Sequence, residues 1–378
     1  EITTADKNTI IGYEAVYSSS ANNDMVVVGY KAGYNLKGDS ENGGVLIGSE
    51  AGYNLTDDTS ATGTPNVFIG YQAGYNFTTA NASLAIGYKA LWGEYVGANG
   101  NSHSNVYGTS LAIGNEAGYA GGNTTGFGGN TYIGHSAGRG HVGGGSVFMG
   151  YEAGKHTASG SADVYIGYNS GKITHLSGDP SGSHTNNGRG SMNVAVGYQS
   201  MMHGGAQNVA IGHDSLAYQS GSSKCVAIGY SAMEGATRDI ANAVAIGYAA
   251  GSGLPDTLYS GQTVIGYQAG YKAGQSVTSV GGSSGYRIGA SSTAVGTEAL
   301  SRGTGNNNTG IGMYALRGNP YTQGLETGNS TGINNVAVGH SAMLNYNSAS
   351  YNTALGQTSL YLIGDGEYST AVGYHAGY

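Results

Sequence analysis

The sequence predicts an all-β protein, a parallel β-solenoid with one short coil per repeat. Three observations predict this fold. A short apolar word ending in glycine recurs along the whole chain, its residues alternate as they do in a strand, and no segment shows a sustained helical period. Two clear copies are 209–212 and 226–229, which both read Val-Ala-Ile-Gly. We number the glycine of each word as slot 0 and every other residue by its distance from that glycine.

The word recurs in 19 copies, and the array therefore predicts about 19 coils. The shortest spacing between two glycines is 15 residues, and six spacings are 17. A repeat array is one continuous object, so residues 1–378 are expected to form a single solenoid rather than several globular domains. The word glycines are Gly12, Gly29, Gly48, Gly70, Gly87, Gly114, Gly134, Gly150, Gly167, Gly197, Gly212, Gly229, Gly247, Gly266, Gly296, Gly312, Gly339, Gly356 and Gly373.

Each word begins with a strand signal. Slot −3 is always Val, Leu or Thr, and slot −1 is always aliphatic or Met. Residues two apart on a strand share one face, and β-branched residues suit a half-buried pleat. We expect this face, the word glycine and the small residue at slot +3 to form the structural core of the repeat. Representative core positions are Ile69, Gly70, Ala73, Ile211, Gly212, Ile228, Gly229, Ile246 and Gly247.

The slots that follow the strand are equally restricted. The glycine at slot 0 indicates a bend or the close approach of another backbone. Slot +3 accepts only Ala or Ser, which indicates a crowded position, whereas slot +4 is either Gly or a bulky aliphatic residue. Slot −4 is often Asn or Ser, and the Gly, Asn and Ser residues between words are typical of turns.

Slot −2 indicates a partner surface. It points away from slots −3 and −1 and would be polar if it faced water. Instead it is Ala in ten copies and a large apolar or aromatic residue in eight. Two buried faces on one thin strand predict an identical chain as partner, because a coil of about 17 residues has too small a core to stand alone.

Charge and cysteine content exclude several classes of protein. Only 10% of the residues are charged, the formal net charge is −8, and the 14 Lys and Arg residues form no cluster. We therefore expect no nucleic-acid partner and, without a long apolar run, no membrane insertion. Cys225 is the single cysteine and cannot form an intrachain disulfide. It occupies slot −4 and is better explained as a small half-buried residue than as a nucleophile.

The words resemble those of a known family. Val-Ala-Ile-Gly, with a preceding Asn or Ser and a following Ala or Ser, is similar to the head repeat of YadA-type trimeric autotransporter adhesins. Ile-Gly-Tyr-Gln-Ala-Gly-Tyr, at residues 69–75 and 265–271, resembles the tyrosine-rich form of phage tail-fibre proteins. The resemblance covers nearly the whole chain. It implies a left-handed parallel β-roll, a homotrimeric fibre, and the presentation of a surface to another cell.

The chain also departs from the autotransporters, since it has no coiled-coil stalk and no membrane-anchor barrel and carries Tyr at slot +1 in eleven copies. We therefore expect a structural and adhesive phage tail fibre that contacts the host cell surface. The alternative is the head of a bacterial trimeric autotransporter adhesin, or a secreted surface filament that mediates attachment. Either is extracellular, on a virion or on a bacterial surface. Words close to both ends suggest a fragment of a longer fibre, with adjoining fibre or chaperone segments.

Recognition is expected in the loops between words, because loops on a rigid scaffold usually carry binding residues. Five are long, at 54–65, 92–108, 172–190, 275–290 and 317–332. Their aromatic and histidine residues could contact a cell-surface glycan or an outer-membrane receptor, although packing against the solenoid is the simpler explanation for Trp92. The candidate binding residues are Trp92, Tyr95, His103, His175, His184, Tyr286 and Tyr321.

Tyrosines at slot +1 are expected to stack coil over coil as a structural ladder rather than as a binding surface. His135, His213 and His340 occupy the same slot. Three copies of such a His could hold a metal at a trimer axis, but a His in this slot is more simply a substitute for Tyr. We expect no metal and no cofactor.

Enzymatic activity is not expected. The pattern Ile-Gly-x-x-Ala also matches the hexapeptide of left-handed β-helix acyltransferases, which remains a remote alternative. Those enzymes need three hexapeptides in tandem per coil, whereas this chain has one per roughly 17 residues. No nucleophile elbow, phosphate loop or repeated carboxylate pair is present.

Overall fold

The structure is a computed structural model that confirms the parallel β-solenoid. It describes residues 7–18, 23–36, 43–55, 65–77, 82–93, 109–119, 128–141, 143–157, 160–173, 191–202, 205–218, 221–235, 240–252, 259–271, 291–302, 305–318 and 330–378. All regular structure in these ranges is β-strand, and none of it is helix. Each of the 19 glycine words forms one three-residue strand directly before its glycine. The chain divides into two units, Glu1–Asn193 and Val194–Tyr378, which are described separately.

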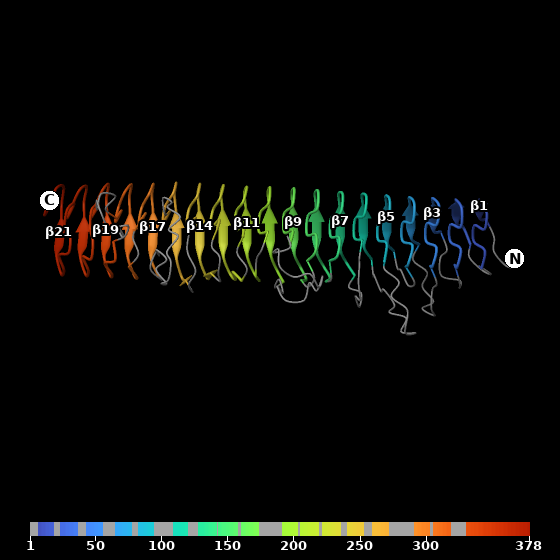
Figure 1. Ribbon diagram of the computed structural model, residues 1–378, viewed down its shortest axis with the longest axis horizontal. Coiled ribbons are helices and arrows are strands. Elements are labelled where there is room, and N and C mark those ends of the chain that lie inside the picture. Colours follow the sequence, from blue (N-terminus) through green and yellow to red (C-terminus); the bar gives the residue numbers. More distant parts are fainter. Residues whose placement is uncertain are drawn as a thin grey trace, which may run out of the picture. The chain divides into compact units, whose positions relative to one another are not determined.

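The first unit contains nine strands that pair in chain order, each parallel to the next. Figure 1 shows their arrows side by side and pointing the same way. The strands are β1 (Thr9–Ile11), β2 (Val26–Val28), β3 (Val45–Ile47), β4 (Val67–Ile69), β5 (Leu84–Ile86), β6 (Leu111–Ile113), β7 (Thr131–Ile133), β8 (Val147–Met149) and β9 (Val164–Ile166).

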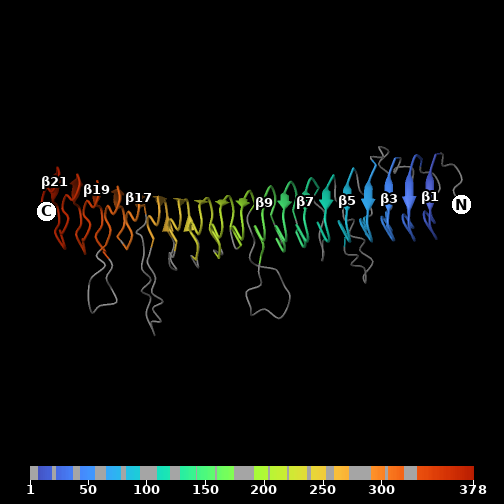
Figure 2. The same ribbon diagram turned by 90° about the horizontal axis from the view of Figure 1, so that it is seen from above.

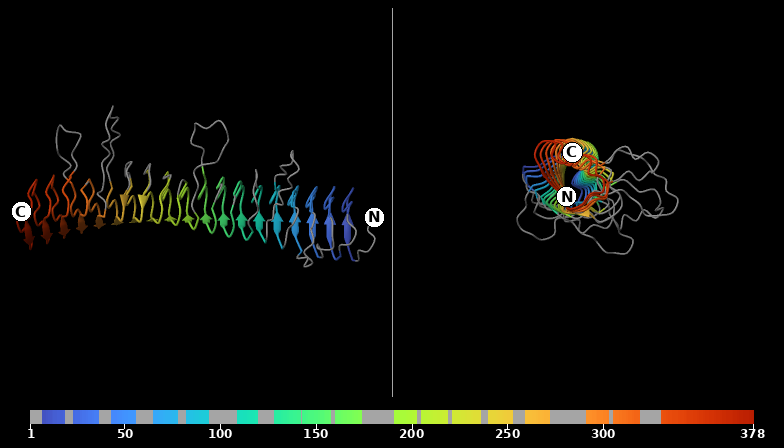
Figure 3. Two further views of the ribbon diagram at one scale, coloured as in Figure 1. Left: turned by 90° about the horizontal axis from the view of Figure 1, so that it is seen from below. Right: turned by 90° about the vertical axis from the view of Figure 1, so that its left-hand side faces the viewer.

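The second unit repeats this arrangement with ten strands of the same kind, again parallel neighbours in chain order (Figures 2 and 3). A short second pair, β13 with β15, lies outside this sheet. The strands are β10 (Val194–Val196), β11 (Val209–Ile211), β12 (Val226–Ile228), β13 (Ile240–Ala241), β14 (Val244–Ile246), β15 (Tyr259–Ser260), β16 (Thr263–Ile265), β17 (Thr293–Val295), β18 (Thr309–Ile311), β19 (Val336–Val338), β20 (Thr353–Leu355) and β21 (Thr370–Val372).

Neighbouring coils are in register slot by slot. Val209 pairs with Val226 and Ile211 with Ile228, and within each unit every other neighbouring pair of words follows the same rule. The backbone bonds continue past the strand: the N–H of Gly229 donates to the carbonyl oxygen of Ile211 at 2.8 Å. The backbone of each coil is thus hydrogen-bonded to the coil before it and the coil after it, as a parallel ladder requires.

The word glycine is explained by the close approach of two backbones. Gly212 has a φ of +133°, and a Cβ atom there would lie 2.3 Å from the carbonyl oxygen of Gly229 in the next coil. The other word glycines with a following coil have the same φ region, and those whose contacts are described show the same collision. Both sequence-based reasons for glycine, a bend and a close backbone, are therefore confirmed.

The turn after each glycine is left-handed at slots +2 and +4. In the β8 coil these are Glu152, with φ +52°, and Gly154, with φ +62°. In the β10 coil they are Gln199, with φ +49°, and Met201, with φ +52°. Non-glycine residues rarely adopt this region. Its recurrence in coil after coil means that stacking of the coils holds the turn in place.

The two faces of the strand are the reverse of the sequence-based expectation. Slot −2, which we expected to face a partner, is the interior of the chain itself: Phe68, Phe148 and Ala210 are completely buried. Slots −3 and −1, expected to form the core, lie on the outer face and are half-buried or exposed. The interior is narrow, so Ala is the commonest residue at slot −2, whereas the aliphatic residues of slot −1 lie outside.

A row of buried polar side chains at slot −4 closes the interior on one side. Asn208 is completely buried. Its Oδ1 accepts from the backbone N–H of Cys225 at 2.9 Å, and its Nδ2 donates to the carbonyl oxygen of Ser222 at 2.7 Å. The same side-chain bond joins Asn335 to Asn352 at 3.0 Å. These bonds satisfy the polar groups that the slot buries, which is the physical reason for its preference for Asn.

Candidate functional site

The outer face of each unit carries two rows of side chains, aliphatic or Met at slot −1 and Val, Leu or Thr at slot −3, which we together call the aliphatic strip. The strip is uncovered in the single chain, because side chains next to an inward slot −2 point outward. Large contiguous apolar surfaces of this kind usually mark an interaction site. Its most exposed slot −1 members away from the chain ends are Ile113 (37%), Met149 (37%) and Ile166 (36%) in the first unit, and Ile211 (39%), Ile265 (36%), Ile311 (40%) and Leu355 (36%) in the second.

The tyrosines at slot +1 form the expected ladder, here called the first aromatic row. Their rings are roughly half-exposed and stack nearly parallel between neighbouring coils. This confirms the structural ladder. Stacked pairs are Tyr13–Tyr30, Tyr71–Tyr88, His135–Tyr151, Tyr151–Tyr168, Tyr198–His213, His213–Tyr230, Tyr230–Tyr248 and Tyr248–Tyr267, with ring centroids 4.6–5.7 Å apart.

A second aromatic row lies at slot +5 of the first unit and was missed at the level of sequence. Trp92 is part of this row. Its ring centroid lies 4.9 Å from that of Tyr119 and 6.2 Å from that of Tyr75. The signal was present, since Tyr or Trp fills slot +5 in each of the first six words. The row consists of Tyr17, Tyr34, Tyr53, Tyr75, Trp92 and Tyr119.

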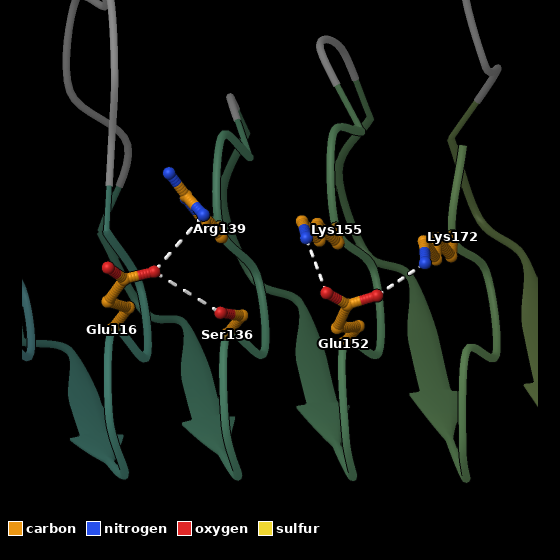
Figure 4. A network of polar contacts seen from close by, with 6 residues as sticks. All are labelled: Glu116, Ser136, Arg139, Glu152, Lys155 and Lys172. Atoms are coloured by element: carbon orange, nitrogen blue, oxygen red, sulfur yellow. Dashed lines mark hydrogen bonds and ion pairs between the residues drawn. The ribbon is translucent and has the colours of Figure 1, made fainter. Parts of the chain in front are cut away.

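Basic side chains continue slot +5 where the aromatic residues end. Arg139 follows Tyr119 and lies over its ring, 5.2 Å from the centroid. Lys155 and Lys172 occupy the slot in the next two coils. Figure 4 shows how these cations meet the carboxylates of slot +2: Arg139 pairs with Glu116 at 3.1 Å. The slot therefore joins neighbouring coils first by ring stacking and then by charge.

Glu152 pairs with two lysines at once, unlike the other carboxylates whose ion pairs lie in the described residues. Its two carboxylate oxygens contact Lys155 of the same coil and Lys172 of the next (Figure 4). Burial by itself would raise the pKa of Glu152, but the hydrogen bonds and charges of the two lysines outweigh it and hold the pKa below its ordinary value. The carboxylate is therefore ionised at neutral pH and acts as a clip between coils.

Two buried titratable groups lie in the interior rather than at a surface. His141 Nε2 donates to the carbonyl oxygen of Gly160 at 3.1 Å, so its Nδ1 is free to accept from the Tyr132 hydroxyl at 2.8 Å. Burial lowers the pKa of His141 to about 4. Cys225 is fully buried rather than half-buried, and burial raises the pKa of its thiol. Neither group is placed to react with an external molecule.

The predicted binding residues fall mainly outside the described part of the chain. Tyr95, His103, His175, His184, Tyr286 and Tyr321 lie outside the described residues. Trp92 alone is described, half-buried in the second aromatic row, which accords with the packing explanation. Its role in recognition stays a prediction.

Two histidines of slot +1, His135 and His213, stack in the ladder as substitutes for tyrosine, whereas His340 meets the edge of Tyr314 at slot +2. His213 stacks between Tyr198 and Tyr230, with centroids 4.6 Å and 4.8 Å away. Within the described ranges, no group of three or more His, Cys, Asp or Glu residues could hold a metal ion. In the same ranges, no helix is long and apolar enough to span a membrane. A search of the sequence against known protein families and against curated proteins finds no match.

Proposed function

We propose that this chain is a structural and adhesive segment of a homotrimeric extracellular fibre, a phage tail fibre that contacts the host cell surface. The fibre role is supported by the architecture: short coils stacked in register make a stiff, repetitive scaffold from which loops can project. The three-fold symmetry and the contact with a host come from the resemblance of the words to YadA-type and tail-fibre repeats. The aliphatic strip supplies the contact surface between chains.

The aliphatic strip is the observation that carries this proposal. A slot −1 side chain such as Ile211 or Ile265 is more than one-third exposed in the single chain, and the strip repeats this in successive coils. Covering the strip with identical strips removes that apolar surface from water at about 25 cal/mol per Å². An identical partner also matches the strip's spacing coil by coil, because all copies share the same repeat.

The oligomer is tested by measuring the mass of the purified chain by light scattering. We expect three times the 38.1 kDa of one chain. The double variant Ile211→Glu and Ile246→Glu places charges in the strip and should reduce the mass to that of a monomer. The matched control is Gln207→Glu, at an exposed turn of the same unit. A wild-type chain that is a stable monomer would overturn the proposal.

Adhesion is tested separately with the intact oligomer on a glycan array and on whole bacterial cells. Saturable binding to one class of surface glycan, or to cells of one host, supports the adhesive role. An oligomer that binds neither glycans nor cells would contradict the adhesive role. The chain would then be a purely structural shaft, and the proposed oligomer would be unaffected.

A further inference from the structure

The outer corner of each coil lies at slot −5, next to the buried slot −4. In every copy but that of Pro65 its backbone is left-handed. The corner is solvent-exposed in nearly every coil, and most copies carry small or polar residues such as Ala162 or Ser291. The two copies before β20 and β21 are different, because they carry Tyr351 and Tyr368. These are the only aromatic residues that the row contains.

Tyr351 and Tyr368 form an exposed stacked pair on the last two coils of the second unit. Their ring centroids are 5.1 Å apart and the rings are within 8° of parallel. The side chains are 47% and 75% exposed. Their backbone φ angles are +59° and +55°, a region that is unfavourable for a bulky residue. Two strained, exposed aromatic residues on adjacent coils need an explanation beyond packing.

The backbone holds the pair at a spacing of one coil, and both rings are exposed to solvent. The N–H of Tyr368 donates to the carbonyl oxygen of Ser350 at 3.2 Å, and Thr353 pairs with Thr370 in the adjoining strands. Because both rings are attached to a fixed backbone, the effective concentration of one ring near the other is high. Exposure gives each ring the rotational freedom that a covalent bond between them requires.

We propose that Tyr351 and Tyr368 are a site of oxidative cross-linking, which joins them as dityrosine when a haem peroxidase and hydrogen peroxide are supplied. Each phenol loses one electron and one proton to give a phenoxyl radical. The radicals couple through the carbons ortho to their oxygens, and the hydrogens on the joined carbons then move to the oxygens to restore two phenols. One hydrogen peroxide accepts the two electrons and two protons and becomes two waters.

This pair differs from the other stacked tyrosines in its surroundings. Some tyrosines of the first aromatic row lie in longer stacks, as Tyr230 does between His213 and Tyr248. Others form the two-ring pairs Tyr13–Tyr30 and Tyr71–Tyr88, and in each of these pairs a lysine ammonium lies over one ring. Tyr34 and Tyr53 of the second row are half-buried. At the corner, both rings of the pair face solvent, and both tyrosines have the left-handed backbone that the tyrosines of slot +1 lack. The product is a covalent staple between residues 351 and 368, one coil apart.

The test treats the purified full chain with a plant haem peroxidase and hydrogen peroxide, then unfolds it and digests it with trypsin and a protease that cuts before aspartate. Cleavage after Arg317 and before Asp365 separates the two tyrosines into peptides 318–364 and 365–378. We expect these peptides to be found covalently joined with the loss of two hydrogens, in chains that run as monomers on a denaturing gel.

The matched control removes a neighbouring pair that would join the same two peptides. Tyr361 and Tyr378 also stack, with centroids 5.2 Å apart. The joined peptides should therefore persist in Tyr378→Phe and fall at least tenfold in Tyr351→Phe and in Tyr368→Phe, both of which keep the ring and hence the stack. Joined peptides that persist in Tyr368→Phe, an absence of joined peptides in the wild type, or linkage mainly between separate chains would each overturn the proposal.

Discussion

The ring of Phe148 fills the space that a side chain on Gly154 would need. A Cβ atom on Gly154 would lie 2.5 Å from the Cδ2 atom of Phe148, in the same coil. The same collision occurs between Gly171 and the ring of Tyr165, at 2.4 Å. Slots −2 and +4 therefore share one volume in the interior, and an aromatic residue at slot −2 requires glycine at slot +4.

The converse arrangement fills the same volume from the other side. Where slot −2 is Ala, slot +4 is in most coils a buried Leu or Met, which explains why slot +4 accepts only two kinds of residue. The Ala residues and their bulky partners are Ala85 with Leu91, Ala195 with Met201, Ala210 with Leu216, Ala227 with Met233, Ala294 with Leu300, Ala337 with Met343, and Ala354 with Leu360.

Because slots −2 and +4 share one volume, two substitutions that are each destabilising should compensate each other. Ala210→Phe should overpack the β11 coil and lower the free energy of unfolding by about 3 kcal/mol. Leu216→Gly should leave a cavity and lower it by about 3 kcal/mol. The double variant rebuilds the arrangement of Phe148 with Gly154, so it should be more stable than the sum of the two losses by at least about 1 kcal/mol. Denaturant unfolding of the four proteins gives the coupling. Strict additivity would contradict the shared volume.

The word glycine should tolerate no side chain at all. Gly212→Ala places its Cβ 2.3 Å from the carbonyl oxygen of Gly229 at a φ of +133°. Backbone atoms cannot move aside without breaking the ladder, so we expect a loss of about 3 kcal/mol or more in the free energy of unfolding. Gly235→Ala is the control in the same unit, because φ is +77° and nothing lies within 4 Å of its Cβ. It should cost only about 1 kcal/mol. Equal losses would argue against the backbone collision.

Acid should lower the free energy of unfolding of the first unit, because folding opposes the protonation of His141. Burial lowers the pKa of His141 to about 4, so the unfolded chain binds its proton at a higher pH than the folded chain. The contribution of His141 to the free energy of unfolding is therefore complete above a pH of about 6.5. It falls by about 3 kcal/mol as the pH decreases toward 4. Thermal unfolding measured across this window checks the prediction.

The control for His141 is a residue that cannot be protonated. His141→Gln can still accept from the Tyr132 hydroxyl and donate to the carbonyl oxygen of Gly160, the two bonds that the imidazole makes. In this variant the dependence of stability on pH between 6.5 and 4 should be smaller by about 3 kcal/mol. An unchanged pH profile would place the acid sensitivity elsewhere.

The strands and the glycine word could be predicted because both depend on residues a few positions apart. A period of two defines two faces, but it does not say which of them lies inside. In Val209-Ala210-Ile211 the larger residues are outside and Ala210 is inside. Only the pairing of Ala210 with Leu216, six residues later, reveals the interior. The sequence shows the restriction at slot −2 and the restriction at slot +4 as two separate patterns, and only their combination identifies the interior.

The second aromatic row shows a different limit. Its six members belong to the first six words only, and the slot then changes to Arg139, Lys155 and Lys172. Later words carry an aromatic residue at this slot only at Tyr271, Tyr361 and Tyr378, so a pattern sought over all 19 words averages out the unbroken run of the first six. The word pattern alone therefore places Trp92 at the start of a loop. The residues that stack on it, Tyr75 and Tyr119, each follow their own word glycine by the same number of residues as Trp92 does.

The ion pair cluster at Glu152 should stabilise the first unit more than its neighbour at Glu116. Glu152 contacts two lysines in a setting that leaves its side chain 11% exposed, whereas Glu116 is 23% exposed and pairs with Arg139 alone among the basic residues. Glu152→Gln should lower the free energy of unfolding by about 2 kcal/mol at pH 7, and Glu116→Gln by about 0.5 kcal/mol. Because the pKa of Glu152 is lowered, its contribution is present above its ordinary value of 4.5 and is lost as the pH falls below it.

Denaturant unfolding of the two variants at pH 7, repeated at pH 3, checks this order. At pH 3 the difference between the wild type and Glu152→Gln should shrink, because the carboxyl binds a proton in the unfolded wild type and must release it on folding to form the ion pairs. Added salt should reduce the effect of Glu116→Gln more than that of Glu152→Gln, since exposed pairs are screened more strongly. Equal losses for the two variants, or a Glu152→Gln effect that grows in acid, would rule out the charged clip between coils.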